Sequence, residues 1–197
     1  MNLVDRVKRI LLSPRTEWEI IDNEPSSPAQ LFTSYAVPLA AIGPVAQIIG
    51  YSVLGFPVPF GGNTRMPLGS AITAAIVTYV LILAATYLLG LIIDALAPTF
   101  SGQRSQIQGL KLAVYSSTAA WIAGFFHLLP GLRFLLILGL YSVYLLYLGI
   151  PVLMKTPPHK TIAYTAVVVV AAIVLFVVNG FVAGHFVAVP TAGWTVP

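Results

Sequence analysis

Long apolar stretches, separated by short polar segments, occupy almost the whole chain. They cover residues 31–56, 68–93, 112–129, 134–154 and 161–189. A helix needs about 20 predominantly apolar residues to cross the hydrocarbon core of a bilayer, and each stretch reaches or approaches that length. The pattern therefore predicts an all-α polytopic membrane protein, a bundle of five transmembrane helices.

The first 30 residues follow a different pattern, in which apolar side chains alternate with charged ones at helical spacing. The apolar positions of the first turns are Leu3, Val7, Ile10 and Leu11. Ser13-Pro14 is typical of a helix start, and the short helix predicted after it carries Trp18, which we expect to be an anchor in the membrane interface. We expect residues 1–30 to form cytoplasmic interfacial helices, and residues 190–197 to form a tail on the outer side.

The composition agrees with a membrane protein and excludes several kinds of site. The chain has 197 residues, of which 58% are hydrophobic and 8% charged, against about 25% charged residues in an ordinary soluble domain. The absence of cysteine excludes disulfides and Cys-ligated zinc. The net charge is +4, but the basic residues are scattered, which favours a role in membrane topology over nucleic-acid binding.

The basic residues are distributed unequally between the two sides of the predicted bundle. Eight lie before the first stretch or in the second and fourth connections: Arg6, Lys8, Arg9, Arg15, Arg104, Lys111, Lys155 and Lys160. Only Arg65 and Arg133 lie in the other connections. Because Lys and Arg accumulate on the cytoplasmic side, we expect a cytoplasmic N-terminus and a C-terminus outside.

Signatures of the common enzyme classes are missing from the sequence. It contains no G-x-S-x-G, no H-E-x-x-H and no Gly-rich phosphate loop. His127, His159 and His185 fall in different segments, on opposite sides in the expected topology. We therefore predict a protein that is not an enzyme and needs no metal or cofactor.

Unusual polar and proline residues gather at the inner ends of the predicted spans. We predict that they form a face for a ligand or partner: Asp94, Lys111, Tyr115, Tyr141, Tyr144, Tyr147, Pro151 and Lys155. Asp94 is the only acidic residue beyond Glu24. A carboxylate near hydrocarbon needs a partner, so we expect it to pair with Lys111, Lys155 or Lys160, either structurally or as part of a functional site.

The tyrosines of the fourth stretch, at positions 141, 144 and 147, share one side of a helix. One interpretation is a polar stripe that lines a groove. The other is hydrogen bonding to Tyr115 or to the hydroxyl groups of residues 116–118. Because the polar groups cluster toward the inner side, we expect a cavity that is open to the cytoplasm and closed toward the outside.

Two further patterns concern packing. Gly180 and Gly184 form a small-xxx-small motif, which favours close helix contact either within the bundle or with a second copy. The connection at residues 129–133 is so short that the third and fourth spans must be antiparallel neighbours. The longer connection at residues 55–67, rich in proline and glycine, is expected to be an irregular outer loop.

Three segments resemble the Yip-domain family of multi-pass membrane proteins. They are D-A-L-A-P-T-F-S-G at 94–102, L-K-L-A-V-Y-S-S-T at 110–118 and Y-x-x-Y-L-L-Y-L-G-I-P-V-L-M-K-T-P at 141–157. The segment S-P-R-T-E-W-E-I-I at 13–21 is similar to the bacterial branch, and the resemblance extends over about residues 5–180. Ala119 stands where the family typically has proline, which puts the kink expected there in question.

The resemblance implies five spans, a cytoplasmic N-terminus and an outward C-terminus, in agreement with the charge distribution. Eukaryotic relatives bind Rab-type GTPases through a long cytoplasmic N-terminal region. This chain has only about 30 residues there, and bacteria lack that trafficking system, so the GTPase role is not carried over.

The functional hypothesis is a non-enzymatic protein of the bacterial inner (plasma) membrane that organises partners or lipids through its cytoplasmic face. Its expected partners are membrane lipids and another membrane protein or a second copy of itself, and no nucleic acid. The alternative is a small transporter or lipid-translocating protein with a groove between the third and fourth spans.

Overall fold

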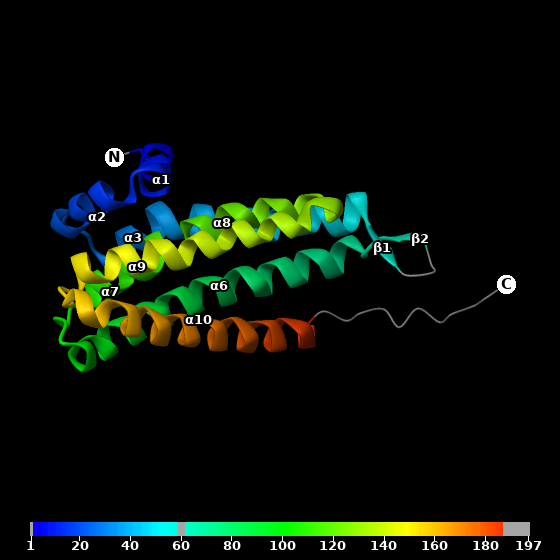
Figure 1. The fold of residues 1–197 in the computed structure, drawn as a ribbon. Helices are drawn as coiled ribbons and strands as arrows, with labels where there is room; N and C mark the ends of the chain where they lie inside the picture. The colour runs from blue at the N-terminus through cyan, green and yellow to red at the C-terminus, as the bar shows by residue number, and fades with distance from the viewer. Residues whose placement is uncertain (1, 59–61, 187–197) are drawn as a thin grey trace.

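A computed structural model describes residues 2–58 and 62–186 of the chain. In this part of the chain, long helices lie side by side as a bundle, with α1 (Leu3–Leu12) and α2 (Pro14–Asn23) at one end and the strands β1 (Phe56–Val58) and β2 (Gly62–Thr64) at the other (Figure 1). We call these the N-terminal end and the far end. The predicted tail at 190–197 and the last residues of the fifth stretch lie outside the described residues.

The first pass of the bundle is an interrupted helix from Pro28 to Leu54. It consists of α3 (Pro28–Leu31), α4 (Val37–Ala40) and α5 (Ile42–Ile48), with π-helical turns at Phe32–Ala36 and Ile49–Leu54. Proline has no N–H to donate to the carbonyl four residues earlier. For Pro44 that carbonyl belongs to Ala40, where α4 ends. The first pass is therefore interrupted where Pro44 removes a helical hydrogen bond.

The connection at 55–67 is more regular than predicted from its composition. Gly55 has a positive φ of 79°, a conformation that glycine adopts without strain. The chain then forms the antiparallel pair β1 and β2, in which Phe56 lies opposite Thr64 and Val58 opposite Gly62. Part of the predicted irregular loop is therefore a small hairpin.

The second and fifth passes are long single helices. They are α6 (Leu68–Leu96), extended by a 3₁₀ turn at Ala97–Phe100, and α10 (Pro158–Phe186). The fourth pass begins as a 3₁₀ helix at Pro130–Leu140 and continues as α9 (Tyr141–Leu153). Together with Pro28–Leu54, these give four helices, among the described residues, that are long and apolar enough to cross a membrane. The all-helical membrane-protein class is confirmed.

The third span differs from the prediction of one continuous helix, because its helix is broken. It consists of α7 (Gln106–Ser116), α8 (Thr118–Ala123) and a 3₁₀ turn at Gly124–Leu128. These pieces follow one another from the N-terminal end toward the far end (Figure 1). No single piece reaches the length of a span, although the path of the chain agrees with the predicted order of passes.

The break at Ser117 occurs although Ala119 replaces the family proline. The hydroxyls of Ser116 and Ser117 both donate to the Ala113 carbonyl, and the Thr118 hydroxyl donates to the carbonyl of Tyr115. Such local bonds compete with the helix and bend it. Three adjacent hydroxyl residues thus accompany a break that does not require proline.

The densest part of the core lies at the N-terminal end. Its fully buried side chains come from the cap as well as the bundle, and include Ile10, Trp18, Ile21, Leu110, Leu112, Leu145, Ile150, Met154 and Tyr164. In contrast, only 6% of the most apolar window of α10 is buried. An exposed apolar helix is stable in lipid, so this asymmetry indicates that lipid covers the rest of the bundle.

Candidate functional site

The helices α1 and α2 fold against the N-terminal end of the bundle, and we call residues Leu3–Asn23 the cap. The Asn2 side chain accepts a hydrogen bond from the Val4 amide at the start of α1. Pro14 begins α2, where a missing N–H has no cost. The apolar sides of both helices face inward, so their predicted amphipathic character is used for packing on the bundle. Their position relative to a membrane surface stays a prediction.

A buried ion pair joins the two cap helices. Arg6 Nη1 lies 2.7 Å from Glu17 Oε1, and the two side chains are only 5% and 1% exposed. The second guanidinium nitrogen of Arg6 pairs with Glu24. The guanidinium carbon also lies 5.6 Å from the centre of the Tyr115 ring, over its face. Both buried charges are compensated, as burial requires.

Lys111 fastens the end of α2 to the bundle. Its Nζ donates to the carbonyls of Ile21, at 2.8 Å, and Glu24, at 2.6 Å. These carbonyls lie at the C-terminal end of a helix, where carbonyls carry partial negative charge; the Ile21 carbonyl also accepts the Glu24 amide at 3.4 Å.

Asp22 forms a second attachment. Its carboxylate is bonded by Lys155 Nζ and by the side-chain amide of Gln108. Two of the predicted site residues, Lys111 and Lys155, therefore lie against the same helix, α2. Both donate hydrogen bonds to polar groups at its C-terminal end.

Trp18 forms the apolar centre of the attachment. Its ring meets Tyr115 edge-on, with centroids 6.3 Å apart. It also lies against Gly149 of α9, where an added Cβ would come within 2.7 Å of Trp18 Cε2. The Trp18 Nε1 atom is buried, and no described residue accepts its hydrogen bond. The predicted role of Trp18 as an anchor in the membrane interface does not fit this buried position.

The predicted pairing of Asp94 with a lysine is wrong. Its carboxylate Oδ2 lies 3.2 Å from the guanidinium of Arg104, whose side chain is 64% exposed. The lysines have other partners, since Lys111 and Lys155 bind α2 and Lys160 donates to Ser101 Oγ. Arg104 was not among the predicted partners because it lies in the loop that follows α6. This loop folds back, so that Arg104 reaches Asp94 near the end of α6.

The tyrosines of α9 do not line a groove between the spans. The Tyr141 hydroxyl donates to the Leu11 carbonyl of the cap, and its ring is 5.3 Å from that of Tyr144. Tyr144 and Tyr147 are exposed on the outside of the bundle. The predicted bonds to Tyr115 and the hydroxyls of 116–118 are therefore absent within the described residues.

Tyr115 instead belongs to a buried group on the first and third passes. Its ring lies 4.6 Å from that of Tyr35, centre to centre, and the Tyr35 hydroxyl is 2.9 Å from Thr118 Oγ1. The predicted face is thus divided into three parts. Lys111, Tyr115, Tyr141 and Lys155 lie under or beside the cap. Asp94 pairs with Arg104. Tyr144 and Tyr147 face outward on α9, which also contains Pro151.

The third and fourth passes are in close contact where the alternative hypothesis places a groove. An added Cβ at Gly139 would lie 3.3 Å from the Ala120 Cα. The Ala120 amide, near the helix break, donates to Ser142 Oγ. The antiparallel neighbours predicted from the short connection are confirmed, and their contact gives no support to a groove between them.

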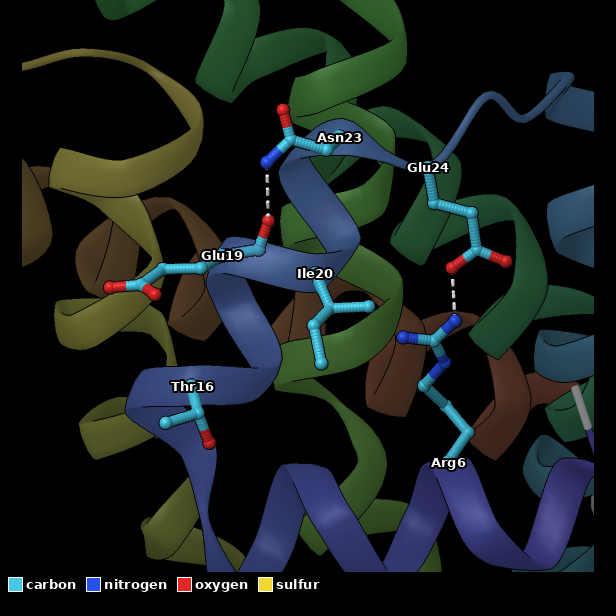
Figure 2. A pocket seen from close by; sticks show the side chains of 6 residues that line it. All are labelled: Arg6, Thr16, Glu19, Ile20, Asn23 and Glu24. Atoms are coloured by element: carbon cyan, nitrogen blue, oxygen red, sulfur yellow. Dashed lines mark hydrogen bonds and ion pairs between the residues drawn. The ribbon is translucent and has the colours of Figure 1, made fainter.

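A shallow hollow lies on the outer side of the cap. Its volume is about 680 Å³, and Figure 2 shows its lining: Arg6, Thr16, Glu19, Ile20, Asn23 and Glu24. The Arg6–Glu24 pair closes one side of it in that view. None of the residues predicted for the ligand face lines this hollow, and the side chains of Lys111 and Tyr115 are buried. This hollow is therefore not the predicted cavity open to the cytoplasm, which stays a prediction.

The outward surface of the cap combines basic and apolar side chains. The exposed residues include the basic residues Lys8 and Arg15 and the apolar residues Val4, Leu12 and Ile20, beside the acidic residues Asp5 and Glu19. Within the described residues, no group of three His, Cys, Asp or Glu side chains is placed to hold a metal ion.

The docking of the cap was missed at the sequence level, although a signal was present. Arg6 and Glu17 fall on the otherwise apolar sides of their helices, beside Ile10 and Trp18. A charge on the apolar side of each of two adjacent helices indicates that the helices face one another or a third element. An amphipathic helix that only lies on lipid has no need of such charges.

Comparison with known proteins places the chain among membrane proteins. The Yip1 domain model matches residues 8–179. The inner membrane protein YohC of Escherichia coli strain K12 is 24% identical over 159 residues, which cover 78% of this chain and 80% of the relative. YohC of E. coli O6:H1 matches to the same extent. No solved structure matches this chain.

Proposed function

The chain belongs to the Yip1 domain family, and on that premise we propose that it is a non-enzymatic inner-membrane protein that organises lipids or partner proteins through the outward surface of its cap. The observation that carries this proposal is the construction of the cap. Polar bonds and the Trp18 contact hold two amphipathic helices on the bundle, and basic and apolar side chains remain exposed on their outer side.

Two observations support the location and orientation that we propose. The relatives from E. coli are inner membrane proteins, and the basic residues concentrate at the N-terminal end of the bundle. We therefore propose that the cap faces the cytoplasm, where anionic lipids attract basic segments by about 1 kcal/mol per Lys or Arg near the surface.

Lys8 and Arg15 allow a direct test of lipid binding, because both are exposed. The protein would be purified in a lipid-preserving detergent, and the bound anionic phospholipids counted by native mass spectrometry. We expect Lys8→Gln combined with Arg15→Gln to reduce bound anionic lipid about 5- to 30-fold, because two surface charges are lost.

Arg65→Gln is the matched control, since Arg65 is exposed at the far end. It should leave lipid binding at the cap unchanged. If the cap variant retained its anionic lipid, the lipid-organising role would be refuted. Photo-crosslinking from Leu12 and Ile20 in cells would then show whether a partner protein contacts the same surface, and the absence of any crosslink would refute the proposal as a whole.

A further inference from the structure

The far half of the bundle contains a cavity of about 400 Å³ between α5, α6, α8 and α10. Four polar side chains from different segments line it: Gln47, Thr78, His127 and Asn179. Thr78 lies ten residues after Leu68, the first residue of α6, or about 15 Å along the helix axis. That depth is near the middle of a hydrocarbon core of about 30 Å, where polar side chains are costly and mark functional sites.

Glycines shape this cavity. An added Cβ at Gly124 would meet the Gly43 Cα at 2.9 Å, so the first and third passes approach one another closely. On another wall, a Cβ at Gly180 would meet no atom within 4 Å. Close contact on one side and unfilled space on the other produce a hollow within the bundle.

Several polar groups in the cavity lack protein partners. Among the described residues, nothing bonds the side-chain amide of Gln47 or the hydroxyl of Thr78. The Asn179 amide nitrogen uses one donor, to the Leu81 carbonyl, and retains a second. Unpaired polar groups in an apolar environment cost several kcal/mol, so an occupant that bonds them would be stabilised.

The lining also defines the chemistry of that occupant. None of the described lining residues is Asp, Glu, Lys or Arg, so a charged headgroup would be buried without a counter-charge. Trp121 and Phe176 supply aromatic walls, and Phe176 is 77% exposed, so the cavity opens on the lipid-facing surface. An occupant can therefore enter from the bilayer.

We infer that this cavity binds the head of an uncharged lipid-soluble molecule through its carbonyl oxygens, with the amides of Gln47 and Asn179 as donors. A quinone ring and the ester groups of a diacylglycerol both have this chemistry, and the volume is within the usual range of ligand sites. This site lies apart from the cap and does not depend on the function proposed for it.

The test uses the full-length protein in phospholipid nanodiscs. A benzoquinone with a decyl tail is titrated in, and Trp121 fluorescence is taken as the difference between wild type and Trp121→Phe. We expect saturable quenching. Dioctanoylglycerol is then added as competitor. Recovery of fluorescence assigns the site to glycerolipid carbonyls, and continued quenching assigns it to quinones.

Gly180→Leu and Gly184→Leu form a matched pair on one helix. A Cβ added at either glycine would have no atom within 4 Å. Only Gly180 lines the cavity. We expect Gly180→Leu to weaken quinone binding at least about 10-fold by filling the space, and Gly184→Leu to leave it unchanged. Gln47→Leu, which removes one hydrogen bond, should weaken binding about 2- to 13-fold and provides a second variant should Gly180→Leu fail to fold.

Three results would overturn the inference. Quenching that rises linearly with quinone and is equal in all variants would show partition into the bilayer only. An equal loss of quinone binding in Gly180→Leu and Gly184→Leu would show that this side of α10 is a contact with a second copy. Binding that is unaffected by Gln47→Leu and by Gly180→Leu, when both variants are folded, would show that the cavity holds only water or lipid chains.

Discussion

At the scale of single residues, the charges near the N-terminal end act mainly within the protein. Arg6 and Glu17 are buried against each other, and Lys111 is bonded to carbonyls of α2. A charge removed from water is tolerated only when it is paired and hydrogen-bonded. Arg6 and Lys111 contribute to the charge asymmetry that predicts topology, and all three residues also attach the cap.

Removing one member of the buried pair should release the cap. We expect Glu17→Gln to destabilise the docked cap by about 3–5 kcal/mol, because it leaves the Arg6 charge inadequately compensated. Hydrogen exchange of the backbone amides of α1 and α2, with the protein in detergent, measures the free energy of cap opening directly.

Glu19→Gln is the control for this change, since Glu19 is exposed on the same helix. This variant should change the free energy of cap opening, measured by hydrogen exchange, by no more than about 0.5 kcal/mol. Arg6→Met combined with Glu17→Met should recover most of the loss. Equal exchange in Glu17→Gln and wild type would contradict the structural importance of the pair.

At the scale of elements, α2 is held by the shape of α9 as much as by polar bonds. The Trp18 ring and the end of the Leu112 side chain occupy the space left by the missing side chain of Gly149. Burying an indole removes about 150–250 Å² from water, worth about 5 kcal/mol before entropy is subtracted. Gly149 is part of the family-like segment at 141–157, so the contact gives that segment a physical role.

Gly149→Ala should therefore displace α2. The new Cβ would lie 2.7 Å from Trp18 Cε2, and overpacking of this kind costs about 1–3 kcal/mol. Limited proteolysis should cut the variant faster within residues 14–27 than the wild type. Gly184→Ala has open space at its Cβ and serves as the control, with an unchanged cleavage rate. Slower or unaltered cleavage in Gly149→Ala would argue against this packing.

At the scale of the whole molecule, the two ends of the bundle are built differently. The N-terminal end is closed by the cap and contains the densest packing, whereas the far half contains the cavity and exposes most of α10. Gly180 and Gly184 belong to this open half, and an added Cβ at either would meet no atom within 4 Å. The predicted close packing of this motif inside the bundle is therefore wrong, and contact with a second copy stays a prediction.

The order of the passes leads to a topology prediction. The connections containing Gln103 and Pro158 lie at the N-terminal end with the cap, and β2 lies at the far end (Figure 1). Reporter fusions at Gln103 and Pro158 should be cytoplasmic, because this end carries the excess of Lys and Arg. Fusions at Gly62 and at the C-terminus should be external. A cytoplasmic C-terminus would contradict an odd number of crossings.

The sequence alone determined the class of the protein and the order of its passes. Apolar stretches of sufficient length specify membrane helices because a lipid environment requires each segment to satisfy its own backbone hydrogen bonds. The motifs at 94–102, 110–118 and 141–157 identified the family, and Yip1 domain membership is confirmed. These features are local in the chain, so they can be read from it one segment at a time.

The tertiary structure decided which residues meet. Arg104 rather than a lysine reaches Asp94, Trp18 fills the space at Gly149, and the polar groups of four segments converge on the cavity. Arg104 and Asp94 are ten residues apart and meet through the loop that follows α6. The other contacts join residues that are distant in the chain, and they depend on helix rotation, on breaks such as that at Ser117 and on where glycines allow close approach. No periodicity in one segment encodes them, since each is a property of two or more helices packed together.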